Sequence, residues 1–273
     1  MNRKSVSFSI LSGKGGVGKS NLALNISCGL HLLGRKVLLI DCDMGLANMD
    51  VLLGVTPGKH LQDILINNQD PAEILIPFGA EGRPGLDLLP ANSGMAGFVD
   101  LDAGARSMLR EKLNPLACAY DFICLDIGAG ISPTVLNFAS MTTLRLVVVT
   151  AEPTSLTDSY ALMKVLSARY DVTDFHIIVN MAESREEAKR TFSRLAAVCE
   201  RFLGFTPSFL CEIRADKVLT DAVRKQRPLM ELAPRSPASR DCMAAAEKLD
   251  KMRGVLSAGG ALDTPLRNVN AVN

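Results

Sequence analysis

The sequence predicts an α/β fold with three layers, in which a mostly parallel, twisted sheet carries helices on both faces. Two observations support this prediction. Apolar runs of strand length alternate with amphipathic segments of helix length almost throughout the 273 residues. Several apolar runs also end in an acidic or amide side chain, at the position where open parallel sheets bind their ligands.

The expected elements follow from these periodicities. The apolar runs predict strands at 6–12, 36–41, 86–90, 121–126, 144–150, 176–180 and 208–211. The amphipathic segments predict helices at 20–33, 46–53, 60–67, 104–117, 133–139, 155–168, 185–202, 215–224 and 236–253. Ser236 fits the N-cap of the last helix, with Pro237 at its first position. We expect a single domain over 1–254, followed by an irregular tail over 255–273.

The first strand leads into a glycine-rich loop that fits G-x-x-x-x-G-K-[ST], the phosphate-binding P-loop. Its glycines let the backbone curl so that N–H groups point at phosphate oxygens, and the next helix adds positive potential. Lys19 would reach the β- and γ-phosphates, and the Ser20 hydroxyl would bind Mg²⁺. The residues expected around the nucleotide are Gly13, Lys14, Gly15, Gly16, Val17, Gly18, Lys19, Ser20 and Asn21. The alternative is a plain glycine-rich turn, which the flanking strand and helix disfavour.

The second strand delivers two carboxylates, Asp41 and Asp43. Because side chains two apart in a strand point the same way, both should face the P-loop. One carboxylate can hold Mg²⁺ through water while the other orients an attacking water. The alternative is that both acids only end the strand and begin a turn.

The strand at 121–126 ends in Asp126, which the glycines Gly128 and Gly130 follow. This is the Walker B arrangement, in which the acid holds a water of the Mg²⁺ shell. The glycines would let the next loop approach the γ-phosphate and change shape on hydrolysis. A simple acid at a strand end is the alternative.

The strand at 144–150 precedes a polar run. Thr154 or Ser155 can cap the following helix. Glu152 and Asp158 could instead lie at a surface that senses the state of the nucleotide.

The strand at 176–180 ends in Asn180. An amide both donates and accepts hydrogen bonds, which suits the edge of adenine, although an isolated Asn at a strand end is also a common turn former. The segment 211–216, with Ile213 and Arg214, lies where a loop covering the base is expected.

The overall composition argues against several classes of protein. A net charge of +1 gives no general attraction to nucleic acid or anionic lipid. The seven cysteines include no C-x-x-C pair, so a metal or cluster site is disfavoured and the thiols are those of a cytoplasmic protein. The sequence contains neither a signal peptide nor the ~20-residue apolar span of a transmembrane helix.

Lys14 is not required by the general P-loop pattern. With it, 14–20 resembles the deviant Walker A motif of the MinD/ParA family of dimerising ATPases, and the resemblance covers roughly 5–250. It implies that Lys14 reaches the phosphates of the partner in an ATP-dependent homodimer. It also implies that Asp43 orients the hydrolytic water, that Ser20, Asp41, Asp43 and Asp126 surround Mg²⁺, and that Asn180 contacts adenine.

Three stretches, 45–54, 126–132 and 152–161, resemble the flagellar-number regulators of this family (the FlhG group, also called FleN or YlxH). The resemblance implies an ATP hydrolase that controls where and how many flagella are built. It also implies a partner, which is a signal-recognition-type GTPase, a C-ring component or a flagellar transcription activator.

Two departures from these regulators bear on partners. Only a few residues precede the first strand, where relatives often carry an extension that stimulates the GTPase. The tail 256–273 has one basic residue, Arg267, and lacks the cationic amphipathic face of a membrane-targeting helix. Peripheral contact with the plasma membrane is therefore not supported by the tail.

Two other functions within the family stay open. A ParA-type DNA-segregation ATPase needs a basic patch, for which Arg185, Lys189, Arg190 and Arg194 could share a helix face, although an ordinary solvated face explains them better. A MinD-type division-site ATPase needs a membrane-binding helix. A cluster-carrying reductase is disfavoured because no suitable cysteine pair is present.

Overall fold

The computed structural model describes residues 5–79, 84–93, 103–258 and 264–268. These residues form an eight-stranded sheet in the order β3-β4-β2-β5-β1-β6-β7-β8. Neighbouring strands are parallel except β3, which runs antiparallel to β4 at one edge. The strands are β1 (Val6–Ser12), β2 (Val37–Cys42), β3 (Ile76–Pro77), β4 (Leu86–Leu89), β5 (Phe122–Ala129), β6 (Leu144–Val149), β7 (His176–Ala182) and β8 (Ser208–Arg214).

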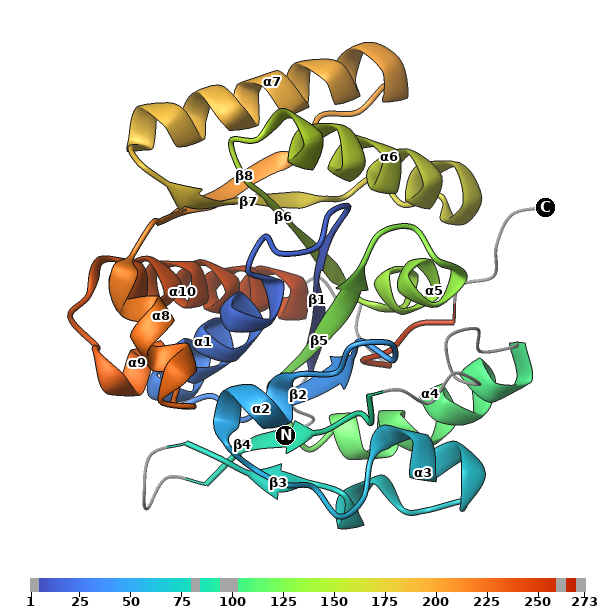
Figure 1. Ribbon diagram of the computed structural model, residues 1–273. Helices are drawn as coiled ribbons and strands as arrows, with labels where there is room; N and C mark the ends of the chain where they lie inside the picture. The colour runs from blue at the N-terminus through green and yellow to red at the C-terminus, as the bar shows by residue number, and fades with distance from the viewer. Residues whose placement is uncertain (1–4, 80–83, 94–102, 259–263, 269–273) are drawn as a thin grey trace.

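Helices cover both faces of the sheet (Figure 1), so the predicted three-layer fold is confirmed. One apolar core joins the sheet to α1, α2, α8, α9 and α10, and a second joins the opposite face to α3, α4, α5, α6 and α7. The helices are α1 (Lys19–Leu32), α2 (Met49–Leu53), α3 (Leu61–Ile66), the 3₁₀ turn η1 (Pro71–Glu73), α4 (Ala103–Ala117), α5 (Pro133–Met141), α6 (Pro153–Tyr170), α7 (Arg185–Leu203), α8 (Lys217–Arg224), α9 (Leu229–Leu232) and α10 (Pro237–Ala258).

Three strands run at least two residues further than their apolar runs indicated, and the first is β7, which continues past Asn180 to Ala182. β5 continues to Ala129, because its backbone still pairs with β1 opposite Ser12 after the apolar run has ended. β8 continues to Arg214, which pairs with Ala182 of β7. Ile213 and Arg214 therefore belong to a strand and not to the loop that was expected there.

The start of α6 differs from its prediction. The helix begins at Pro153, so neither Thr154 nor Ser155 is its N-cap. The Ser155 hydroxyl instead accepts a hydrogen bond from the Thr150 N–H at 3.0 Å. This ties the end of β6 to the first turn of the helix.

The start of α2 also lies later than expected, at Met49. The Asp41 carboxylate accepts hydrogen bonds from the N–H groups of Asn48 and Met49, both at 3.2 Å. The first turn of α2 is therefore fixed by a side chain of the neighbouring strand.

The predicted cap of α10 is confirmed, because the Ser236 hydroxyl accepts a hydrogen bond from the Ser239 N–H at 3.2 Å. The helix extends to Ala258, so the boundary expected at Gly254 falls inside it. β3, η1 and α9 were not predicted. They are only two to four residues long, too short for a periodic pattern to develop.

The described part of the C-terminal tail packs against the body of the protein. Leu266 is 2% exposed and lies in the core with α4 and α5. Its backbone exchanges two hydrogen bonds with the Asn114 side chain, at 2.9 and 3.2 Å. The Arg267 N–H donates to the carbonyl of Met141 at 2.9 Å. These contacts make the segment part of the fold.

Among the described residues, no helix combines the length and apolar character that crossing a membrane requires.

Candidate nucleotide-binding site

The C-terminal ends of β1, β2, β5 and β7 meet at one edge of the sheet, where two cavities open. The larger, about 600 Å³, is lined by the P-loop together with Asp43, which follows β2, and Gly128, near the end of β5. The smaller, about 420 Å³, lies between β7, the end of β8 and α8, and includes Asn180. We call them the phosphate cleft and the base cavity, because the P-loop lines the first and the predicted adenine contact lines the second.

The glycines of the P-loop meet two physical requirements. Gly16 and Gly18 have φ values of 79° and 90°, which residues with a side chain rarely adopt. At Gly13 the constraint is close approach, because a Cβ there would lie 2.1 Å from the backbone carbon of Asp158 in α6. The loop can therefore turn toward phosphates while it rests directly on α6.

The Lys14 side chain makes its hydrogen bonds within its own chain. Its ammonium donates hydrogen bonds to the Glu152 carboxylate and, at 3.0 Å, to the Thr154 hydroxyl. The hydrogen bond and charge of Lys14 lower the pKa of Glu152. The Lys14 carbonyl is held by the Ser12 hydroxyl at 2.6 Å. The residue that the P-loop pattern does not require is thus tied to the start of α6.

Asp41 and Asp43 have different surroundings. Asp41 is 1% exposed and accepts N–H bonds from Asn48, Met49 and, at 3.0 Å, Asp43. Burial raises its pKa despite these donors. Asp43 lies beyond the end of β2 in the phosphate cleft, where its carboxylate accepts the Leu46 N–H at 3.0 Å. Asp41 thus shapes the loop that carries Asp43.

Asp126 is buried beside the P-loop, where its neighbours are the Ser20 hydroxyl and the Lys19 ammonium, and neither carboxylate oxygen makes a hydrogen bond of good geometry. Burial and the neighbouring Asp41 carboxylate raise its pKa. Burial lowers the pKa of Lys19, while the charges of Asp126 and Asp43 act in the opposite direction. A buried carboxylate beside a hydroxyl, with no well-formed hydrogen bond to either oxygen, fits a site for a divalent cation with oxygen ligands, so these residues fit Mg²⁺. Ser20 lines the same cleft.

Asn180 is 4% exposed and lies under the P-loop. Its side-chain amide donates to the carbonyl of Val17 at 2.8 Å. Gly18 must be glycine here for a second reason, because a Cβ would lie 2.5 Å from the Asn180 amide nitrogen. The predicted adenine contact therefore also supports the loop that would bind the phosphates.

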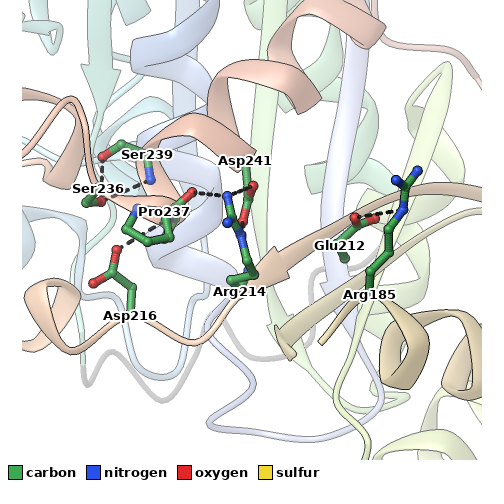
Figure 2. Close-up of polar contacts among 9 residues, drawn as sticks. Arg185, Glu212, Arg214, Asp216, Ser236, Pro237, Ser239 and Asp241 are labelled. Carbon is green, nitrogen blue, oxygen red and sulfur yellow. Dashed lines mark hydrogen bonds and ion pairs between the residues drawn. The ribbon is translucent and has the colours of Figure 1, made fainter. Parts of the chain in front are cut away.

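Ile213 is 2% exposed, and the guanidinium of Arg214 is bound to α10 (Figure 2). Two guanidinium nitrogens of Arg214 donate to the Asp241 carboxylate, at 2.8 and 2.7 Å. Asp216 accepts the N–H groups of Val218 in α8 and Ala238 in α10, at 3.0 and 3.1 Å. These bonds fix the wall of the base cavity.

The structure thus brings the P-loop, Asp41, Asp43, Asp126 and Asn180 to one edge. It adds two residues that were not singled out from the sequence. Met181 and Leu219 line both cavities. Nothing in the local sequence marks them, because their position depends on the pairing of β7 with β8 and on the placement of α8.

Comparisons with known proteins indicate the family of the chain. A family model described as an AAA domain matches residues 6–175. The antiactivator FleN of Pseudomonas aeruginosa is 38% identical over 243 residues, which cover 89% of this chain and 85% of FleN. The flagellum site-determining protein YlxH of Helicobacter pylori is 32% identical over 263 residues, covering 94% of this chain and 85% of YlxH.

Solved structures of MinD proteins have a fold similar to that of this chain. A chain of the MinC:MinD cell division protein complex of Aquifex aeolicus has a TM-score of 0.75 and 27% identity, covering 90% of this chain and 96% of its own. The septum site-determining protein MinD of Pyrococcus horikoshii, complexed with Mg-ADP, has a TM-score of 0.72 and 23% identity, covering 92% and 98%.

Proposed function

Because this chain belongs to the MinD/ParA family of ATPases, as a relative of the FleN and YlxH flagellar regulators, we propose that it is an ATP-driven dimerisation switch. It binds and slowly hydrolyses ATP, and it thereby controls the number or placement of flagella. The observation that carries this proposal is Lys14, which lies in an otherwise complete P-loop but binds Glu152 and Thr154 at the edge of the site.

The chemistry is transfer of the γ-phosphoryl group to water, which depends on positioning and electrostatics. Lys19 and the P-loop N–H groups hold the phosphates, and Asp43 orients the attacking water. Asp126 and Ser20 would hold Mg²⁺, with Asp41 fixing the loop that carries Asp43. When bound, Mg²⁺ would offset the negative charge of the phosphate oxygens.

The switch follows from the position of Lys14. In the dimer, the Lys14 ammonium leaves Glu152 and contacts the phosphates bound to the partner. The apolar side chains of Leu46, Val51 and Ile131, which are 76%, 59% and 51% exposed near the phosphate cleft, supply apolar surface for this contact. Hydrolysis removes the γ-phosphate that Lys14 contacts, and the dimer then separates.

The names of two relatives support the biological part of the proposal. FleN is named an antiactivator, and YlxH is named a flagellum site-determining protein. We propose that this protein binds its partner in one nucleotide state only, so that hydrolysis ends the interaction. The proposed partner is a flagellar transcription activator, a C-ring component or a signal-recognition-type GTPase.

The test is the mass of the protein in light scattering with ATP and Mg²⁺. We expect a dimer for the wild type and a more persistent one for Asp43→Ala, which should not orient the water. Lys14→Ala should remain monomeric while it still binds ATP. A dimer of Lys14→Ala that forms as readily as the wild type contradicts the switch.

The biological role is tested separately by counting flagella in a deletion strain complemented with wild type or Lys14→Ala. An unchanged number and position in the deletion strain would remove the flagellar role and leave the ATPase proposal intact. In that case, a gel shift with duplex DNA and sedimentation with anionic vesicles, both with ATP, would distinguish the ParA-type and MinD-type alternatives.

A further inference from the structure

The end of β7 contains a β-bulge beside the site. Val179 pairs with Glu212 and Ala182 pairs with Arg214, so β7 uses one more residue than β8 over this stretch. Asn180 and Met181 therefore lie opposite the single residue Ile213. Bulges of this kind redirect side chains and are frequent next to active sites.

The bulge places Met181 in a strained conformation. Its φ is 57°, in the left-handed region that a residue with a long side chain rarely adopts. Asn68 and Asp171 have similar φ values, but Asn and Asp tolerate this region, and Gln226, at 52°, is the other long side chain that adopts it among the described residues. Strain of this kind persists where the surrounding structure holds it in place, and it is common at ligand sites.

The Met181 side chain lies between the two cavities. It lines both the phosphate cleft and the base cavity, as does Leu219 from α8. A Cβ on Gly18 would lie 3.6 Å from the Met181 methyl group, so the side chain also borders the P-loop. Met181 is 45% exposed, which leaves an apolar side chain uncovered at the centre of the site.

We propose that Met181 is a nucleotide-binding residue whose side chain closes against Leu219 over the sugar and purine of the bound nucleotide. This inference rests on the proposed function, because it assumes that the two cavities hold the phosphates and the base of one ATP molecule. A nucleotide that occupies both must cross the boundary that the cavities share, which is lined by Met181, Leu219 and Asn21. The unbranched thioether of Met adapts its shape to a partner and makes favourable contacts with aromatic rings.

The test compares two ligands by calorimetry in the presence of Mg²⁺. ADP fills both cavities and does not provide the γ-phosphate that the proposed dimer requires, whereas pyrophosphate fills only the phosphate cleft. Met181→Gly should weaken ADP binding about tenfold, because the apolar contact with the base and sugar is lost. Pyrophosphate binding should not change. Met181→Leu should retain most of the ADP affinity, because it keeps an apolar side chain of similar volume.

A second readout separates this role from a structural one. Met181→Gly removes the strain, so its melting temperature should rise by about 2 °C while ADP binding weakens. Asn68→Gly is the matched control, because it changes a left-handed residue that lines neither cavity and should leave ADP binding unchanged. Met181→Asn, which tolerates the same backbone conformation, should reproduce the loss of ADP affinity.

Each outcome decides one question. If the wild type binds neither ADP nor pyrophosphate, the proposed function is wrong. If the wild type binds both and Met181→Gly binds ADP equally well, the role of Met181 is wrong and the proposed function stands. An equal loss of ADP and pyrophosphate also overturns the proposal, because Met181 would then act by shaping the P-loop.

Discussion

The Lys14 ammonium is paired with the Glu152 carboxylate, which lies 138 positions later in the same chain. Both side chains are partly exposed, at 37% and 62%. Exposed ion pairs contribute little to stability because water screens them and both side chains lose freedom. The contact is therefore weak enough to be exchanged for another anionic partner.

The first prediction concerns this exchange. Glu152→Gln removes the carboxylate that competes with the partner's phosphates for Lys14. We expect a tighter ATP-dependent dimer. Its dissociation constant should fall by less than about tenfold, because the Lys14–Glu152 pair is exposed. The dissociation constant can be measured by analytical ultracentrifugation with ATP in an Asp43→Ala background, which slows hydrolysis.

Lys14→Ala and the double variant Lys14→Ala/Glu152→Gln provide the control. If Glu152 acts through Lys14, the second substitution should have no effect once Lys14 is absent. A weaker dimer for Glu152→Gln would show that Glu152 supports the dimer itself, and it would contradict the proposed exchange.

The second prediction concerns the contact between the P-loop and α6. In Gly13→Ala, the new Cβ would lie 2.1 and 2.5 Å from backbone atoms of Asp158 and Ser159. Backbone atoms cannot move aside as a flexible side chain can, so the loop and the helix must separate. We expect a loss of more than about 2 kcal/mol in the free energy of unfolding, measured by urea denaturation.

Gly15→Ala is the matched control, because its Cβ would meet nothing within 4 Å and its φ is not in the left-handed region. It should change the free energy of unfolding by no more than about 0.5 kcal/mol. Equal losses for the two variants would mean that the packing of Gly13 against α6 does not explain the glycine.

Much of this site could be predicted from the sequence, because its residues follow apolar runs that form central parallel strands. Asp41 and Asp126 end such runs and are paired directly across β2 and β5. The P-loop was identifiable because its glycines, lysine and serine occur at fixed spacing within one segment. The roles of these residues stay predictions until nucleotide binding is measured.

The remaining features depend on contacts between distant segments. Nothing near Lys14 in the sequence indicates that Glu152 binds it. The bulge at Met181 arises from the pairing of β7 with β8, and the extension of β8 to Arg214 depends on the same pairing. Periodicity describes one segment at a time, so it cannot detect an extra residue in one of two paired strands.

The third prediction concerns the buried carboxylate of Asp126. Asp126→Asn removes a buried carboxylate whose ionised form is disfavoured by burial and by Asp41 more than the Ser20 hydroxyl and Lys19 favour it. We expect the nucleotide-free protein to gain about 1 kcal/mol in the free energy of unfolding, measured in EDTA. The same variant should lose Mg²⁺-dependent ATP hydrolysis.

These opposite effects distinguish a cation site from a structural acid. A variant that is both less stable and inactive would indicate that Asp126 supports the fold through contacts of its own. Glu73→Gln is a control at an exposed acid that lines neither cavity; loss of its surface ion pair with Lys59 should change the free energy of unfolding by less than about 0.5 kcal/mol and leave hydrolysis unchanged.

The fourth prediction concerns the C-terminal segment, which packs into the core although its sequence resembles an irregular tail. Leu266 is 2% exposed, and Asn114 holds its backbone with two hydrogen bonds. In Leu266→Ala, the apolar contact is lost and a cavity forms, so the free energy of unfolding should fall by about 2 kcal/mol. Urea denaturation of the full chain measures this change.

Val255→Ala in α10 is the comparison, because Val255 lies near the same end of the chain but is 75% exposed. It should change the free energy of unfolding by less than about 0.5 kcal/mol. Limited proteolysis adds a local readout, since a segment that no longer docks should be cleaved faster than the rest of the protein. If Leu266→Ala matches Val255→Ala in both measurements, residues 264–268 contribute nothing to the stability of the fold.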